Sequence, residues 1–360
     1  MAKLGEVCDI LNGYAFKSNQ YTTSGVRIIR ISNVQKGYIE DKSPVYYPCD
    51  DENVKKYELK QNDLLISLTG NVGRTALLEE KFLPAALNQR VSCIRLKEPD
   101  KVLKTYLFHL LNSDYFEQQC MKAAEGVAQK NLSPKWLFEY KIPIYSIERQ
   151  KEISNTLDKI DLLIILRKQQ LAKLDELVKA RFVEMFGDPI GNTKNLPVTK
   201  FVDVVKMQRG FDLPVQERKS DGMIPVYGSN GVLGYHDISK VKGGGVITGR
   251  SGTIGKVFYE KEEFWPLNTT LFSLNSHGND VVYLKYLLEL FDLSRFTEGT
   301  GVPTLNRNKF HDELIIDVPL DEQERFAAFV ERVDQQKQTV QQSLEKLELM
   351  KKALMQEYFG

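Results

Sequence analysis

Long hydrophobic runs are missing from this 360-residue chain. Its longest uninterrupted aliphatic stretch, Leu162 to Leu166, has five residues, whereas a helix that crosses a bilayer needs about 20. Glu6 and Asp9 stand where the apolar stretch of a secretory signal would begin. We therefore expect neither a membrane span nor export, and a cytoplasmic location.

Cysteine and histidine are scarce. The four cysteines are far apart in the first half of the chain: Cys8, Cys49, Cys93 and Cys120. The four histidines form no His-x-x-x-His pair: His109, His236, His277 and His311. Structural zinc sites need closely spaced ligands, and disulfides belong to oxidising compartments. We therefore expect reduced thiols and no metal site.

Net charge is almost absent. Lys and Arg total 49, Asp and Glu total 48, and the formal net charge is +1. This balance excludes a polybasic protein that holds nucleic acid by bulk charge, and also an acidic disordered chain. With 42% hydrophobic residues the chain can form ordinary cores. Its length indicates two domains, because single cores seldom grow beyond about 250–300 residues.

A nucleotide-binding loop is also missing. The segment from Gly249 to Lys256 is rich in glycine, but a phosphate-binding loop needs glycine five residues before the glycine of its Gly-Lys pair and Ser or Thr after it. Those positions hold Arg250 and Val257. The glycines instead predict a turn between two strands.

Two kinds of catalytic centre lack their motifs. A restriction nuclease would place Pro-Asp shortly before Glu-x-Lys, whereas Glu79-Glu80-Lys81 here precedes Pro99-Asp100. An adenine methyltransferase would carry an Asn- or Asp-Pro-Pro-aromatic motif and a glycine-rich cofactor loop, and the sequence has neither. The residues therefore point to recognition, and we expect no catalytic residues.

What the chain does contain is an internal repeat. Residues 150–187 align without a gap with residues 323–360, and 11 of the 38 pairs are identical, including Gln150 with Gln323 and Gly187 with Gly360. Farther upstream, Leu132 matches Leu305, the run Thr69-Gly-Asn-Val-Gly-Arg74 resembles Ser251-Gly-Thr-Ile-Gly-Lys256, and Leu87-Asn88 resembles Leu267-Asn268. The chain is therefore two copies of one unit, each a globular block followed by a helix.

Both predicted helices carry a heptad seam, with steps of four and three residues typical of a coiled coil. The first seam runs through Ile153, Leu157, Ile160, Ile164, Arg167, Leu171, Leu174, Val178, Arg181 and Met185. The second runs through Phe326, Val330, Val333, Lys337, Val340, Leu344, Leu347, Lys351, Leu354 and Tyr358. The simplest arrangement packs the two seams against each other.

Each helix should contain about 33 residues and extend about 50 Å at 1.5 Å per residue. The first should end at Gly187, because glycine suits a C-terminal cap and Pro189 prevents continuation. Antiparallel pairing would place one globular block at each end, which predicts an α+β dumbbell with a pseudo-twofold axis.

The globular blocks mix short strands, loops and short helices. Expected strands are 27–31, 63–67 and 246–248, and expected helices are 106–111 and 283–290.

This layout resembles the specificity subunit of type I restriction–modification systems. The entry to each helix carries the family's pattern: Gly126, Leu132, Leu137, Ile142-Pro143-Ile144 and Gln150 in the first copy, and Gly299 or Gly301, Leu305, Phe310, Val318-Pro319-Leu320 and Gln323 in the second. The first copy departs from the pattern at 145–149, where the family usually has Pro-Leu and Glu-Gln. Gly13 to Lys17 and Tyr227 to Gly231 also look like target-domain signatures.

The resemblance implies four segments. Residues 1–146 and 188–320 would be target recognition domains, each composed of mixed α/β structure, and residues 147–187 and 321–360 would be the two conserved helical regions that pair as an antiparallel coiled coil. Each domain would read one part of a split, asymmetric DNA sequence. The helices would dock two methyltransferase subunits, which use S-adenosylmethionine, and the restriction and motor subunits, which use ATP and Mg2+, would join them. This chain would bind no cofactor itself.

Candidate base-reading residues are polar side chains on glycine-rich loops, because Arg pairs with guanine and Asn or Gln with adenine. In the first block they are Lys17, Arg27, Arg30, Asn33, Asn71, Arg74, Asn88, Gln89 and Arg90. In the second they are Arg209, Ser229, Asn230, His236, Arg250, Ser251, Lys256, Arg307 and Lys309. The alternative for each is a solvated side chain or a turn hydrogen bond. The alternative for the whole chain is a coiled-coil scaffold that binds proteins and not DNA.

Overall fold

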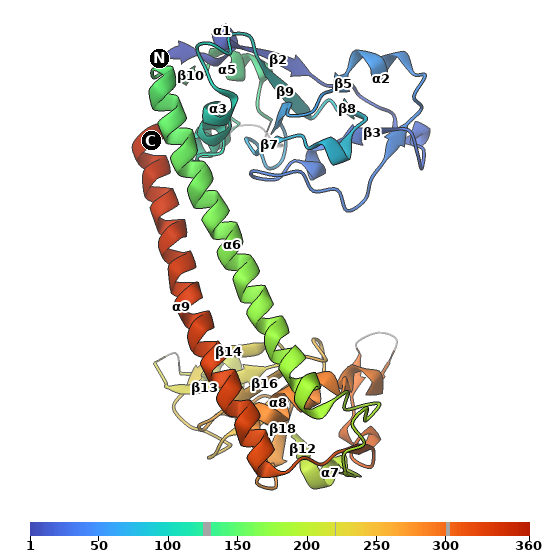
Figure 1. Cartoon of the computed structure of the whole chain (residues 1–360). Coiled ribbons are helices and arrows are strands. Elements are labelled where there is room, and N and C mark those ends of the chain that lie inside the picture. The colour runs from blue at the N-terminus through green and yellow to red at the C-terminus, as the bar shows by residue number, and fades with distance from the viewer. Residues whose placement is uncertain (125–130, 220, 300–302) are drawn as a thin grey trace. The chain divides into compact units, whose positions relative to one another are not determined.

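The computed structural model describes residues 1–124, 131–219, 221–299 and 303–360 (Figure 1). Two positions of the family pattern, Gly126 and Gly301, lie outside these ranges. The chain forms two compact units. Unit 1 consists of Met1–Arg167 and Ser343–Gly360, and unit 2 consists of Lys168–Gln342.

Unit 1 contains two four-stranded sheets and a strand pair. The antiparallel sheet has the order β2 (Cys8–Asn12), β9 (Val91–Leu96), β6 (Leu64–Ser67) and β7 (Thr75–Leu77). The mixed sheet has the order β4 (Tyr46–Tyr47), β3 (Val26–Ile29), β8 (Ala85–Leu87) and β5 (Glu58–Leu59), with β3 and β8 parallel. β1 (Ala2–Lys3) pairs with β10 (Lys141–Ile142). The helices are α1 (Leu4–Val7), α2 (Glu52–Lys56), α3 (Lys104–Leu111), α4 (Asp114–Ala123) and α5 (Pro134–Glu139).

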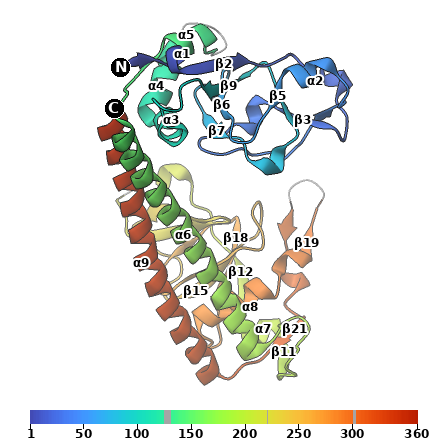
Figure 2. The same cartoon turned by 45° about the horizontal axis from the view of Figure 1, so that its top comes forward.

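Unit 2 repeats this plan. Its antiparallel sheet has the order β12 (Lys206–Arg209), β18 (Thr270–Asn275), β15 (Gly245–Gly249) and β16 (Val257–Glu260). Its mixed sheet has the order β14 (Gly231–His236), β13 (Ile224–Gly228) and β17 (Trp265–Pro266), with β13 and β17 parallel. The pairs β11 (Val198–Lys200) with β21 (Leu314–Ile316) and β19 (Thr297–Glu298) with β20 (Thr304–Leu305) complete the strands. The helices of this block are α7 (Phe201–Val204) and α8 (Val281–Leu290), both labelled in Figure 2. α8 packs on β15 and β16.

Hydrogen bonds match the two units position by position. The Leu132 amide donates to the Leu68 carbonyl at 2.7 Å, and the Leu305 amide donates to the Arg250 carbonyl at 2.8 Å. The sequence-based pairing of Leu87-Asn88 with Leu267-Asn268 is wrong by one residue. Asn88 corresponds to Leu267, because Asn88 pairs with Tyr14 and Leu267 pairs with Phe211 in isolated β-bridges. Tyr14 and Phe211 each lie in the loop after the first strand of their antiparallel sheet.

The glycine-rich runs are turns, as predicted. Gly252 and Gly255 lie between the antiparallel strands β15 and β16 and have φ angles of 83° and 92°. Gly70 and Gly73 occupy the same places between β6 and β7, with φ angles of 66° and 82°. Glycine is favoured at all four positions because other residues rarely adopt positive φ.

Five elements expected from the sequence are present. Strands β3, β6 and β15 and helices α3 and α8 lie on the predicted runs. β3 ends at Ile29 rather than at Ile31, because the chain enters a short 3-10 helix over Ile31–Asn33.

Two 40-residue helices follow the globular blocks: α6 (Ile147–Phe186) and α9 (Leu320–Phe359). They pack together antiparallel, as predicted, but each is longer than the expected 33 residues. Lys351 of α9 pairs with Asp161 of α6 in unit 1, and Lys337 of α9 pairs with Asp175 of α6 in unit 2. None of the helices formed by the described residues has the length and apolarity that a membrane span requires.

Burial along the two helices follows the seams over most of their length. The buried seam residues are Ile153, Leu157, Ile160, Ile164, Leu174, Val178, Phe326, Val330, Val333, Val340 and Leu344. Leu171 is partly buried against the hydrophobic core of unit 2, and Leu354 is partly buried against that of unit 1. Leu347 is also intermediate in exposure.

The heptad pattern is wrong at the C-terminal end of each helix. In α6 the buried residues are Phe182 and Phe186 rather than Met185, and in α9 they are Met355 and Phe359. A strict heptad drifts by about 20° per repeat on a straight helix. These last turns also face the core of a globular block. Phe182 and Phe186 belong to the hydrophobic core of unit 2, and Met355 and Phe359 belong to that of unit 1.

Candidate nucleic-acid interface

Three loops of unit 1 leave the same end of the antiparallel sheet. The strand register pairs Asn12 with Ser92 and Ser67 with Val91, so the chain segments beyond these residues lie together. We call residues 13–17, 68–74 and 88–90 loop cluster 1. Asn88 also bonds to the end of β3 through its amide, which donates to the Ile29 carbonyl at 3.2 Å.

Four of the candidates in loop cluster 1 point into solvent. The exposed ones are Lys17, Asn71, Gln89 and Arg90. They come from all three loops, so the fold brings together polar groups that are up to 73 positions apart in the sequence. This set combines two cations with two side-chain amides that can both donate and accept hydrogen bonds.

Other candidates of the first block take part in internal contacts. Arg27 forms an ion pair with Asp41, and its guanidinium lies 5.1 Å from the centre of the Tyr46 ring. Asn33 is buried and donates from Nδ2 to the Glu40 carbonyl at 3.0 Å and to Asp41 at 2.9 Å.

Three more candidates of the first block form hydrogen bonds within it. Arg30 donates from Nη2 to the Ser43 carbonyl at 2.6 Å, and Arg74 donates from Nη1 to Gln35 Oε1 at 2.6 Å. Asn88 is buried and accepts from the Arg90 amide at 3.3 Å. These side chains hold loops in place, whereas the exposed four are available to a ligand.

Unit 2 gathers its loops at the equivalent end of its sheet. Arg209 pairs with Leu271, and Gly249 pairs with Thr270. We call residues 210–214, 228–231, 250–256, 267–269 and 304–309 loop cluster 2. The turn at Ser229-Asn230 belongs to it, because Lys256 Nζ donates to Asn230 Oδ1 at 2.9 Å.

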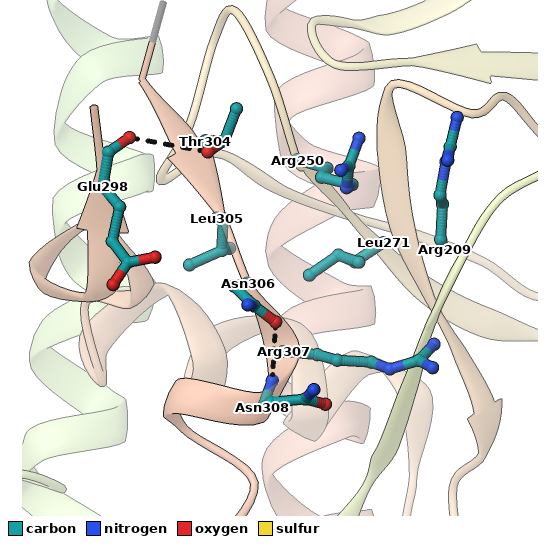
Figure 3. Close-up of a pocket in the computed structure, with 9 residues that line it drawn as sticks. All are labelled: Arg209, Arg250, Leu271, Glu298, Thr304, Leu305, Asn306, Arg307 and Asn308. Carbon is teal, nitrogen blue, oxygen red and sulfur yellow. Dashed lines mark hydrogen bonds between the residues drawn. The ribbon is translucent and has the colours of Figure 1, made fainter. Parts of the chain in front are cut away.

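A pocket of about 300 Å³ opens beside loop cluster 2 (Figure 3). It is lined by Arg209, Arg250, Leu271, Glu298, Thr304, Leu305, Asn306, Arg307 and Asn308. Its three arginines come from β12, from the loop after β15 and from the segment after β20, and they lie on the side of the pocket away from Glu298 (Figure 3). We call it the arginine pocket.

Among the described residues that line the pocket, Glu298 is the only carboxylate. It forms an ion pair with Lys309 Nζ at 3.0 Å, and Lys309 is the last residue of the short 3-10 helix that begins at Arg307. The lining therefore carries excess positive charge.

A neutral histidine supports this wall. His311 Nε2 accepts a hydrogen bond from the Met207 amide at 3.2 Å, so that nitrogen carries no proton. Burial lowers the pKa of His311 below its ordinary value, and the nearby Arg307 guanidinium lowers it further. The histidine ties the segment after Arg307 to strand β12.

His236 is the candidate that the fold sets apart. It is buried against Trp265, with ring centres 5.3 Å apart. It pairs with Ile224, at the opposite end of the β13–β14 hairpin from the Ser229-Asn230 turn. Its place favours a packing role.

Sequence reasoning missed Thr304, Asn306 and Asn308. Asn306 accepts from the Asn308 amide at 3.1 Å and caps a short 3-10 helix, Arg307–Lys309. The polar run Asn306-Arg307-Asn308-Lys309 next to a repeat landmark, Leu305, was the available signal. Among the described residues no group of His, Cys, Asp and Glu is arranged to hold a metal ion.

Curated relatives share part of the chain. The type I restriction enzyme MjaVIII specificity subunit of Methanocaldococcus jannaschii is 32% identical over 186 residues, which cover 50% of this chain and 43% of that protein. The type I restriction enzyme EcoprrI specificity subunit of Escherichia coli is 23% identical over 300 residues, which cover 76% of this chain and 71% of that protein. The chain thus spans less than half of the first relative.

Solved structures share the fold along almost all of the chain. The crystal structure of the type I restriction–modification S subunit from M. genitalium aligns with a TM-score of 0.61 at 15% identity, covering 100% of this chain and 95% of that one. A chain from a structural study of complex assembly and conformational transition in the type I R-M system aligns with a TM-score of 0.63 at 15% identity, covering 99% and 96%.

The family model described as "Type I restriction modification DNA specificity domain" matches residues 1–176 and 194–349. These ranges include both loop clusters, both mixed sheets and most of α6 and α9. The chain therefore belongs to the family of type I restriction modification DNA specificity domains.

Proposed function

We propose that this chain is the DNA-recognition subunit of a type I restriction–modification complex and reads a bipartite, asymmetric target. Residues 1–146 and 188–320 are the two target recognition domains, and residues 147–187 and 321–360 are the helical regions that join them. The observation that carries the proposal is the repeated backbone with different loop side chains. Loop cluster 1 exposes Lys17, Asn71, Gln89 and Arg90, whereas loop cluster 2 has the arginine pocket.

The repeated framework and the differing loops have distinct roles in this proposal. In this proposal, similar sheets and matching backbone hydrogen bonds present both loop clusters in the same way to a duplex. Different side chains on that framework select different bases, because direct readout depends on donors and acceptors that match base edges. One chain with two such surfaces recognises two unlike half-sequences.

Partner subunits perform the chemistry in this proposal. Two methyltransferase subunits use S-adenosylmethionine to methylate adenine at N6, and restriction subunits with motor activity use ATP and Mg2+ for cleavage. An aliphatic patch on α6 supports docking of a partner on the helices: Leu162, Leu163, Ile165 and Leu166 are all exposed. Contiguous exposed apolar side chains favour a protein interface.

Methylation mapping tests the proposal. The chain is co-expressed with its methyltransferase partner in a host that lacks other adenine methylation, and N6-methyladenine is located across the genome. We expect one bipartite motif. Replacing residues 188–320 with the corresponding segment of a relative should change one half of the motif and leave the other unchanged. Methylation without any motif, or a motif unaffected by the replacement, would refute the proposal and favour a protein-binding scaffold.

A further inference from the structure

We infer that the arginine pocket reads guanine in the half of the target that unit 2 recognises. This inference rests on the proposed function and adds to it a base identity and the side chains that select it. It follows from the charge of the pocket, from the lack of arginine at the matched positions of unit 1 and from the geometry of the guanidinium group.

The pocket has cationic groups that its own lining does not neutralise. Arg209 Nε donates to a backbone carbonyl, that of Asn268, at 3.4 Å and not to a carboxylate. The one carboxylate of the lining, Glu298, is engaged by Lys309. A pocket of about 300 Å³ with this charge attracts the electronegative edge of a base or a phosphate oxygen.

Unit 1 has no arginine at the equivalent positions. Leu68 replaces Arg250, as the matching hydrogen bonds from Leu132 and Leu305 establish. Leu68 is 5% exposed and belongs to the core of unit 1.

The other two arginines are replaced as well. Asn12 occupies the place of Arg209. Each is the last residue of the first strand of its antiparallel sheet, and each pairs with the second residue of the neighbouring strand, which is β9 for Asn12 and β18 for Arg209. Pro134 occupies the place of Arg307, two residues after the matched leucine. Among the described residues of unit 1, none of the three matched positions therefore carries an arginine.

This asymmetry favours a base over a phosphate. Both units would meet the same sugar–phosphate backbone, so both units would need a pocket that holds a phosphate. A base-reading group is required only where that base occurs. Two arginines from separate segments can each present a two-donor edge, which matches the O6 and N7 acceptors of guanine in the major groove.

Single substitutions in the full complex test the inference. Arg250→Gln and Arg307→Gln each remove one guanidinium group with its paired N–H donors. Arg250→Lys keeps the charge but removes the paired donors. Lys200→Gln is the control, since Lys200 is an exposed cation of the same block that lies outside loop cluster 2 and outside the long helices, and it pairs with Asp312 at 3.0 Å. Each variant is co-expressed with the methyltransferase partner, and N6-methyladenine is mapped as for the unmodified chain.

We expect the wild-type motif to contain guanine in the half that changes when residues 188–320 are replaced. Arg250→Gln, Arg250→Lys and Arg307→Gln should relax discrimination at a guanine of that half by about tenfold or more. The other half-sequence should stay unchanged and serves as evidence that each variant is folded and assembled. Lys200→Gln should reproduce the wild-type motif.

Three outcomes would overturn the inference while leaving the proposed function intact. The first is a bipartite motif without guanine in that half. The second is a uniform loss of methylation at all sites with unaltered base preference, together with normal behaviour of Arg250→Lys, which identifies a phosphate contact. The third is no effect of any arginine substitution. Absence of a bipartite motif in the wild type would instead refute the proposed function.

Discussion

Two buried glutamines join the globular blocks to the long helices. Gln150 Oε1 accepts from the Leu103 amide at 2.8 Å, while its Nε2 donates to the carbonyls of Lys101 and Tyr145. Gln323 repeats this in unit 2, where its Oε1 accepts from the Asp280 amide at 2.9 Å. The internal repeat therefore retains a glutamine at this place for a structural reason.

Replacing either glutamine should destabilise its own unit. Gln150→Leu leaves a buried amide and two carbonyls without partners, so the free energy of unfolding of unit 1 should fall by about 2–3 kcal/mol. Gln323→Leu should have the same effect on unit 2. Denaturant unfolding measures both, and Gln118→Leu, at an exposed position of α4, should change stability by less than about 0.5 kcal/mol. Equal stability of all three variants would contradict this structural role of Gln150 and Gln323.

A second residue-scale prediction concerns pH. His109 is buried, and its Nε2 lies 2.7 Å from Asp158 Oδ1. Burial lowers the pKa of His109 below its ordinary value, although the Asp158 carboxylate opposes the shift. Between the ordinary pKa near 6.5 and the lower folded value, the unfolded chain binds the proton and the folded chain does not, so stability is lost as the pH falls.

Unfolding measured between pH 7.5 and 5.5 checks this sign. The free energy of unfolding of unit 1 should decline as the pH drops below about 6.5, and His109→Gln should reduce that decline because it removes the titrating group. His311 contributes a slope of the same direction in unit 2. A pH profile of unit 1 that His109→Gln leaves unaltered would contradict the prediction.

Residue types on loops predicted the candidate interface only in part. Lys17 and Arg90 are exposed as expected, but Arg27 looked equally suitable and is paired with Asp41, 14 positions away. Local sequence does not reveal such a partner, because the pairing depends on how the loop folds back. Asn33 is a second example, because it is buried and its side-chain amide donates to the Glu40 carbonyl.

At the scale of elements, periodicity was the most informative signal. The seams, the end of α6 at Gly187 and the glycine turns follow from spacing and from glycine's backbone freedom, which are local properties. The order of strands in the sheets does not, because β2 pairs with β9 across about 80 intervening residues. Parallel pairs such as β3 with β8 are also long-range.

The last turns of α6 offer a test of where the seam ends. The Phe182 ring lies 5.0 Å from that of Phe186 and 5.4 Å from that of Phe326. Phe182→Ala should cost about 3–5 kcal/mol, as for other buried aromatics. Val183→Ala, next to it but exposed, should cost less than about 0.5 kcal/mol. Thermal unfolding measures both, and similar losses would show that Phe182 does not contribute to the core of unit 2.

At the scale of the whole molecule, charge limits how tightly the chain can hold DNA alone. Residues 1–146 contain 20 basic and 17 acidic side chains, and residues 188–320 contain 15 and 16. Strong backbone binding requires several neutralised phosphates. Under the proposed function, the balance therefore favours a division of labour, in which partner subunits supply much of the affinity and this chain supplies the choice of sequence.

Salt titration checks this division. Affinity of the isolated chain for a target duplex should be low and should fall by no more than about tenfold between 50 and 200 mM salt, since proteins with 6–10 phosphate contacts lose about 10³–10⁵. The complex with the methyltransferase subunits should bind more tightly and depend more steeply on salt. A steep dependence for the isolated chain would show that it holds the backbone itself.

The division of the chain between its two units also fixes an order of events during synthesis. Unit 2 is one continuous segment, whereas unit 1 needs Ser343–Gly360, whose Met355 and Phe359 belong to its core. At about 5–20 residues per second, roughly 10–40 s separate translation of Arg167 from that of Phe359. The block that the ribosome makes first is therefore the last to be completed, and its unfilled core is exposed to chaperones and proteases until the final helix arrives.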